Sequence, residues 1–160
     1  MPEVKKIVNF YNMESHPEGG WYKETYRSIT ELSIDNLGKR NLMTSIYFLL
    51  ESHQTSNFHQ IKSDELWFYH SGSPLTVHCI YPNGKYEMLH IGPDFEKGHT
   101  FQALVPKGTI FGSTVNNENS YSMVGCVVSP GFDFNDFKLF NNEELLQEFP
   151  QHQSIINKLT

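Results

Sequence analysis

The chain has 160 residues and a formal net charge of -6 at pH 7, with 38% hydrophobic and 14% aromatic residues. This length suits one domain with a full core and is short for two, so we expect a single domain over residues 1–160. The chain is acidic overall and has no run of basic residues that could neutralise phosphates. We therefore do not expect a nucleic-acid partner. The aromatic content favours a β-rich protein with a lined cavity.

The N-terminal residues contain no apolar segment of signal-peptide length. No stretch approaches the roughly 20 apolar residues of a membrane span, so we expect no membrane partner and a cytoplasmic location. The two cysteines, Cys79 and Cys126, lie in apolar runs. They predict buried thiols rather than a disulfide framework.

The first predicted element is an amphipathic helix over residues 3–13, where apolar residues recur with the spacing of one helix face. Residues 16–20 contain Pro17 and two glycines, so they predict a turn. Strand signals then follow one another without an intervening helix. They cover residues 21–30, 42–50, 57–61, 65–70, 75–81, 85–91, 100–105, 110–115 and 121–128. Such a series predicts a β-sandwich or barrel.

The last residues change character. Asn141 is typical of a helix N-cap, and the acidic residues that follow it suit the positive end of a helix. We therefore predict a helix through Phe149 that Pro150 ends, and a last helical turn over residues 154–159.

The most informative stretch is residues 56–72 (SNFHQIKSDELWFYHSG). His59, Glu65 and Gly72 have the spacing of the first cupin motif, H-x-H-x3-E-x6-G, with Ile61 at the position of the second histidine. The later segment VPKGTIF, residues 105–111, resembles the P-x-G-x2-H core of the second cupin motif and ends in a phenylalanine instead of the histidine. Two half-motifs in this order resemble a cupin domain and imply a double-stranded β-helix, or jelly-roll barrel.

The chain is more closely similar to one cupin family, DUF985 or Cupin 5. The resemblance is carried by HPEGGWYKETYRS (residues 16–28), TSIYFLL (44–50), SNFH and SDELW (56–59 and 63–67) and VGCVVSPGFDF (124–134). It implies an all-β cupin domain, usually dimeric, with a likeness to sugar-nucleotide epimerases and sugar isomerases. It implies no settled reaction.

Strand periodicity indicates which side chains share a face. Glu65, Trp67 and Tyr69 alternate along one predicted strand, so with His59 they are expected to line one cavity. A carboxylate inside a barrel needs a partner, and His59 is the expected one. The alternative is that Glu65 is an exposed strand residue and His59 a surface histidine.

The sequence is compatible with three kinds of site in this cavity: a metal site, a metal-free site for proton abstraction, and a site that binds a ligand without turnover. A metal site needs three or four converging ligands; His59 and Glu65 supply two, while Ile61 and Phe111 cannot ligate. A divalent metal is therefore an open possibility with an incomplete ligand set. Without a metal, a neutral His59 held by a carboxylate suits proton abstraction. The third class is a protein that binds a small ligand without turnover.

The candidate residues divide by expected role. For catalysis we expect His59 and Glu65, with Tyr47 as an acid across the cavity, as the resemblance to the epimerases implies. Tyr69 is a second candidate for this acid, and both tyrosines are equally explained as aromatic residues of the wall. The expected ligand-binding residues are Trp67, Tyr69, Gln102, Phe111, Glu24 and Arg27. Glu24 and Arg27 have a second interpretation as a structural ion pair.

The expected assembly is a homodimer. Residues 21–30 form a strand that would be an exposed sheet edge if left alone. Pairing with a second subunit covers such an edge, and the family resemblance implies the same state.

Overall fold

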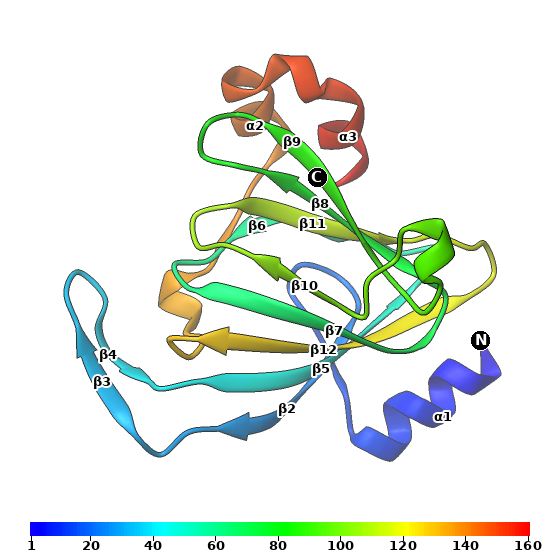
Figure 1. The fold of residues 1–160 in the computed structure, drawn as a ribbon, viewed down its shortest axis with the longest axis horizontal. Helices are drawn as coiled ribbons and strands as arrows, with labels where there is room; N and C mark the ends of the chain where they lie inside the picture. The colour runs from blue at the N-terminus through cyan, green and yellow to red at the C-terminus, as the bar shows by residue number, and fades with distance from the viewer.

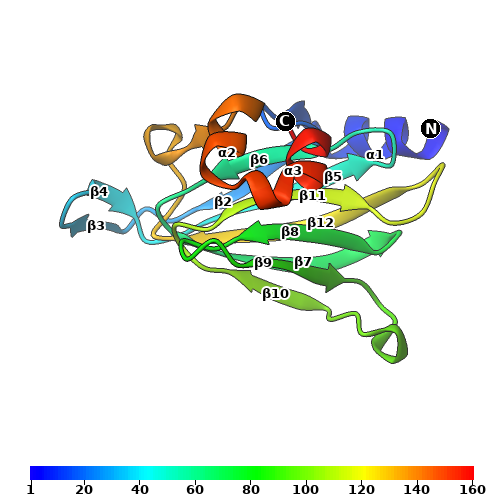
Figure 2. The same ribbon diagram turned by 90° about the horizontal axis from the view of Figure 1, so that it is seen from above.

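A computed structural model describes residues 1–160, and its main feature is two antiparallel β-sheets packed face to face (Figures 1 and 2). The first sheet has six strands in the order β1 (Glu14–Ser15), β2 (Trp21–Arg27), β5 (Thr44–Glu51), β12 (Tyr121–Ser129), β7 (Asp64–Gly72) and β10 (Gln102–Val105). The second has five, in the order β13 (Lys138–Leu139), β6 (Ser56–Gln60), β11 (Ile110–Val115), β8 (Leu75–Ile80) and β9 (Tyr86–Ile91). The jelly-roll fold class, expected from the strand series together with the two half-motifs, is confirmed.

The main core lies between the two sheets, where alternate side chains of each strand point inward. It includes Phe48 and Leu50 from β5, Val124 from β12, and Val77 and Cys79 from β8. Both cysteines are buried free thiols, as expected from their apolar context. No helix of the protein is both long enough and apolar enough to cross a membrane.

Helices cover the outer faces of the sheets. Helix α1 (Pro2–Tyr11) packs Val4 against Leu49 and Met123 of the six-stranded sheet. Helices α2 (Asn142–Glu148) and α3 (Gln153–Lys158) pack on the outer face of the five-stranded sheet, at the top of Figure 1. The predicted N-cap of α2 is present, because Asn141 and Glu144 form a reciprocal capping box.

A hairpin that the sequence analysis did not predict extends away from the two sheets (Figure 2). Its strands are β3 (Glu31–Ile34) and β4 (Gly38–Asn41), which pair only with each other. The hairpin carries few apolar residues and is largely exposed, so it lacks the alternating burial pattern on which strand prediction depends. The two-residue strands β1 and β13 were missed because they are too short to show a period.

The C-terminal helices are expected to contribute to global stability through Leu145, which is fully buried under the five-stranded sheet. Leu145→Ala should lower the free energy of unfolding by about 2–5 kcal/mol, because it leaves a cavity in this cluster. Urea denaturation followed by circular dichroism measures the loss. Gln147→Ala, at an exposed position of the same helix, is the control and should change stability by less than about 0.5 kcal/mol. Equal stability of the two variants would contradict this packing role.

Candidate functional site

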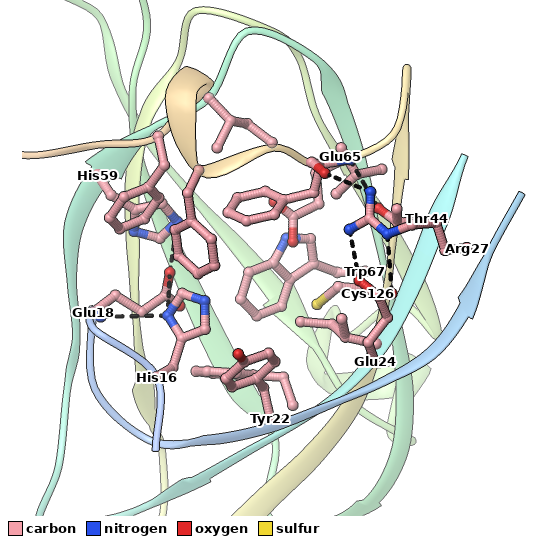
Figure 3. A pocket seen from close by; sticks show the side chains of 17 residues that line it. His16, Glu18, Tyr22, Glu24, Arg27, Thr44, His59, Glu65, Trp67 and Cys126 are labelled. Carbon is pink, nitrogen blue, oxygen red and sulfur yellow. Dashed lines mark hydrogen bonds and ion pairs between the residues drawn. The ribbon is translucent and has the colours of Figure 1, made fainter. Parts of the chain in front are cut away.

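A cavity of about 150 Å³ lies between the sheets, toward the end where β2 and β12 finish and β5 begins (Figure 3). Its walls come from the turn before β2, from β2, β5, β6, β7 and β12, and from the segment after β12. The lining residues are His16, Glu18, Tyr22, Glu24, Arg27, Thr44, Ile46, Phe48, His59, Ile61, Glu65, Trp67, Cys126, Val128, Phe132, Phe134 and Phe137.

One wall is made by the turn of residues 16–20, which lies directly against neighbouring backbone. Gly19 has φ +115°, and a Cβ there would approach the carbonyl oxygen of Thr55 to 2.1 Å. Gly20 has φ +74°, and its Cβ would lie 2.7 Å from the Leu49 carbonyl oxygen. Only glycine tolerates both the positive φ and the close approach. The two glycines therefore let the turn pack closely enough to direct Glu18 inward.

Glu18 is the centre of a buried polar cluster with residues of β6. Its Oε1 accepts a hydrogen bond from the Ser56 hydroxyl at 2.7 Å, and its Oε2 lies 3.0 Å from His59 Nε2. The other ring nitrogen of His59, Nδ1, lies 2.7 Å from the Asn57 carbonyl oxygen, to which it donates a proton. His16 Nδ1 is 3.4 Å from Glu18 Oε2 and accepts from the Glu18 backbone N–H. Both nitrogens of His59 are thus occupied by protein atoms.

Burial sets the protonation of this cluster. Desolvation lowers the pKa of His59 to about 4, and it also lowers the pKa of His16. Desolvation raises the pKa of Glu18 from its ordinary value. Burial therefore disfavours the charged form of both partners, the imidazolium of His59 and the carboxylate of Glu18.

Glu65 lies on the other side of the cavity in Figure 3, on β7. Its side-chain hydrogen-bond partner is the Cys126 thiol of the adjacent strand β12, and it forms no ion pair. Burial, with a smaller contribution from the charge of Glu18, raises the pKa of Glu65 to about 8. At neutral pH this group is mostly a neutral carboxylic acid that faces the cavity.

Aromatic rings form most of the remaining wall. Phe132, Phe134 and Phe137 come from the segment that follows β12, and they pack on one another with ring-centre distances of 4.9–6.2 Å. Asp136 fixes this segment to the body through a bidentate ion pair with Arg40, at 2.6 and 2.9 Å. The segment thereby acts as a strap of three phenylalanines across the cavity.

Glu24 and Arg27 form the ion pair that was one of their two interpretations, and they do so at the cavity mouth. The guanidinium binds both carboxylate oxygens of Glu24, at 3.0 and 2.7 Å. Its remaining terminal nitrogen donates to Asn41 Oδ1 and to the Phe132 carbonyl oxygen. The Glu24–Arg27 pair therefore holds the strap in place and also lines the cavity.

The structure brings five of the nine predicted site residues to the cavity and leaves four outside it. His59, Glu65, Trp67, Glu24 and Arg27 line it; Tyr47, Tyr69, Gln102 and Phe111 do not. The expected contact of His59 with Glu65 was wrong, because His59 pairs with Glu18.

Each of the four displaced residues has a local reason for its position. Tyr47 points to the outer face of β5 and packs against Tyr11 and His70. Tyr69 lies farther along β7 and donates its hydroxyl to the Gly72 carbonyl. Phe111 is buried behind His59, with the two rings 4.1 Å apart, and Gln102 is exposed on the edge strand β10.

Sequence reasoning missed His16 and Glu18 as site residues. Their segment was interpreted as a turn, and the glycines do form one. The signal that could have identified them is the specificity of the HPEGG string, whose acidic residue a turn does not require.

The residues at the cupin metal positions do not fit a metal ion. His59 uses both ring nitrogens on protein atoms, and two further motif positions hold Ile61 and Phe111, which lack donor atoms. No three His, Cys, Asp or Glu side chains converge to form a ligand set. The residues at these positions therefore do not make a metal site.

Comparison with known proteins identifies relatives along nearly the whole chain. Residues 5–140 match the family model described as Cupin superfamily (DUF985). An uncharacterized protein of Saccharomyces cerevisiae is 27% identical over 165 aligned positions, which cover 92% of this chain and 82% of the yeast protein.

Solved structures extend the comparison. A protein of Shewanella oneidensis is 44% identical with a TM-score of 0.90 and 98% and 96% of the two chains covered. A hypothetical protein from Leishmania major is 35% identical, with a TM-score of 0.93 and 98% of both chains covered. Oxalate decarboxylase of Bacillus subtilis, at 15% identity and a TM-score of 0.61, shares the fold over 91% of this chain and 37% of its own. That likeness concerns the fold alone.

The raised pKa of Glu65 predicts how stability depends on pH. Between its ordinary pKa of 4.5 and the folded value of about 8, the folded protein binds more protons at Glu65 than the unfolded chain does. The contribution of Glu65 to the free energy of unfolding therefore falls as pH rises through this window. Glu65→Gln mimics the neutral acid, so it should be the more stable protein at pH 8, by up to about 4 kcal/mol, and the difference at pH 5 should be below about 1 kcal/mol.

Urea unfolding of both proteins at pH 5, 6.5 and 8 measures this difference. Glu148→Gln, which changes an exposed carboxyl, serves as the control and should follow the parent at each pH. A stability difference between Glu65→Gln and the parent that does not depend on pH would contradict a buried neutral acid.

Proposed function

The chain belongs to the DUF985 family of the cupin superfamily, and from this premise we propose that it binds a small polar ligand in the cavity and transfers protons on it, as an isomerase or epimerase does. The observation that carries the proposal is Glu65. A carboxyl 7% exposed, without a basic partner, costs free energy unless something in the cavity offers it a hydrogen bond. A structural role would be filled better by an apolar side chain.

The size of the cavity limits the ligand. About 150 Å³ accommodates a molecule of the size of one six-membered ring. A single sugar ring meets this limit, and the larger part of a sugar nucleotide would have to lie outside the mouth. Aromatic faces such as that of Trp67 would pack on the ring, while Glu65 would bind a polar substituent.

In the proposed reaction, the two buried acids have opposite tasks. Glu18, in the form in which His59 holds the shared proton, removes a proton from a carbon next to a carbonyl group. Glu65 in its neutral form gives its proton to the carbonyl oxygen, so that a C–H bond breaks and an enol O–H forms. For an isomerisation, Glu18 gives its proton to the former carbonyl carbon while the ionised Glu65 takes the hydroxyl proton from the first carbon, which becomes the new carbonyl. For an epimerisation, the enol turns over in the cavity, Glu18 returns its proton to the opposite face of the same carbon, and Glu65 takes back the enol proton. His59 assists through Glu18 and is here a positioning residue rather than the base itself.

A second candidate is binding without turnover. It is favoured by the weak basicity of His59, which follows from burial and from the engagement of both its nitrogens. In that case Glu18 and Glu65 would recognise the ligand and move no proton on carbon. A proton-exchange experiment separates the two candidates.

Solvent exchange tests the proposed proton transfer. Small sugars and hydroxycarbonyl compounds of one-ring size are incubated with the protein in D2O, and loss of C–H signal is followed by ¹H NMR. We expect exchange into at least one compound, slowed about 100-fold or more in Glu65→Gln and in Glu18→Gln. Glu148→Gln should exchange at the parental rate. Exchange that Glu65→Gln leaves unchanged would remove Glu65 from the mechanism, and binding of compounds without any exchange would favour the second candidate.

We further propose a homodimer and keep the cytoplasm as the expected compartment. Strand β1 covers β2 only at Trp21 and Tyr22, so the outer edge of β2 from Lys23 to Arg27 is unpaired. A second copy could continue the sheet there. Light scattering at micromolar concentration should give about twice the chain mass of 18.5 kDa. The mass of a single chain would contradict the dimer.

A further inference from the structure

The charged groups at the cavity favour a cationic ligand over an anionic one. The one guanidinium at the mouth, that of Arg27, uses four N–H donors on Glu24, Asn41 and the Phe132 carbonyl oxygen. Only one of its five N–H donors remains to bind a carboxylate or a phosphate. Inside the cavity an anionic ligand would find no lysine and no second arginine, and the carboxyls of Glu18 and Glu65 offer it no positive charge. The site therefore disfavours anions.

The same wall suits a cation. Six aromatic side chains line the cavity: Tyr22, Phe48, Trp67, Phe132, Phe134 and Phe137. Aromatic faces attract a desolvated ammonium group, and the attraction increases where water is excluded. The carboxyl of Glu65 lies in the same enclosed space, is nine-tenths buried and has only a thiol as hydrogen-bond partner. A positively charged group would find there both a counter-ion and π-faces.

We infer that the ligand of this cavity carries a protonated amino group on a ring-sized skeleton, and that Glu65 is its counter-ion. This inference rests on ligand binding in the cavity, which both candidates for the proposed function share, and it specifies the class of the ligand. Because a ligand that ionises Glu65 removes its proton donor, the inference goes with the second candidate, binding without turnover. It places the ammonium group at Glu65 and the carbon skeleton against the strap of Phe132, Phe134 and Phe137. The neutral Glu18–His59 pair would remain available to the polar substituents of the ligand.

Binding of an ammonium ion should change the protonation of Glu65. In the free protein the groups that act on its carboxyl are Cys126 and Glu18, neither of which is cationic. A bound ammonium ion favours the carboxylate, so Glu65 loses its proton on binding at pH 7. Calorimetry in two buffers with different ionisation enthalpies detects this released proton, and an uncharged ligand should release none.

Three probes of matched shape test the inference: cyclohexylamine, cyclohexanol and cyclohexanecarboxylate. Their affinities for the full-length protein at pH 7 are measured by calorimetry or ligand-observed NMR. We expect the amine to bind about tenfold or more tightly than the alcohol, and the carboxylate to bind most weakly. The amine should release up to about one proton, as the linked ionisation of Glu65 requires.

Two variants and one control variant test which residues cause the preference for the amine. Glu65→Gln should bind amine and alcohol about equally, whereas Glu148→Gln should keep the parental preference. Phe134→Leu keeps an apolar side chain without a π-face, so it should weaken the amine more than the alcohol.

The outcomes distinguish this inference from the proposed function. If the alcohol binds as tightly as the amine, or the carboxylate binds best, the amine class is wrong while binding in the cavity stands. A preference for the amine that survives in Glu65→Gln also overturns the inference. If none of the three probes binds, this inference and the proposal of a ring-sized ligand both fail.

Discussion

The buried carboxyl of Glu18 ties the turn that leads into one sheet to a strand of the other sheet. It binds the hydroxyl of Ser56 and the ring of His59, while its backbone carbonyl accepts from the Asn57 N–H at 2.8 Å. An isolated buried carboxylate would be very costly, so these contacts must form together. The same contacts close one end of the space between the sheets. The polar cluster around Glu18 and the cavity therefore both depend on how this turn packs against β6.

The second buried acid makes the cavity chemically asymmetric. Glu18 is hydrogen-bonded to Ser56 and paired with His59, whereas the partner of Glu65 is the thiol of Cys126. The two carboxyls therefore lie in different environments. Pairs of titratable groups held in different environments are a usual basis for acid–base chemistry. The arrangement also costs stability, because Glu65 is buried without a base. Proteins tolerate such costs mainly where function requires them.

The chain keeps the cupin fold but carries different residues at inward positions of the two cupin motifs. Ile61 and Phe111 occupy motif positions that hold metal ligands in other cupins, and both are buried. Phe111 packs on His59 and so helps to fix the ring that pairs with Glu18. A strap of phenylalanines, held by Arg40 and Asp136, supplies the rest of the wall. One fold can thus host a site of a different kind by substitution at a few inward positions.

The amino-acid sequence by itself determined the strand series, the capped helix at Asn141, the jelly-roll frame and the inward direction of Glu65 and Trp67. These features depend on local periodicity and on short motifs, which one segment contains in full. Tyr47 was misassigned because β5 is apolar on both faces, so alternation does not distinguish inside from outside. Only the tertiary structure decided that His59 binds Glu18 rather than Glu65. That choice depends on where the glycine turn is placed against β6, and the close approach of two segments distant in the chain leaves no periodic signal in either of them.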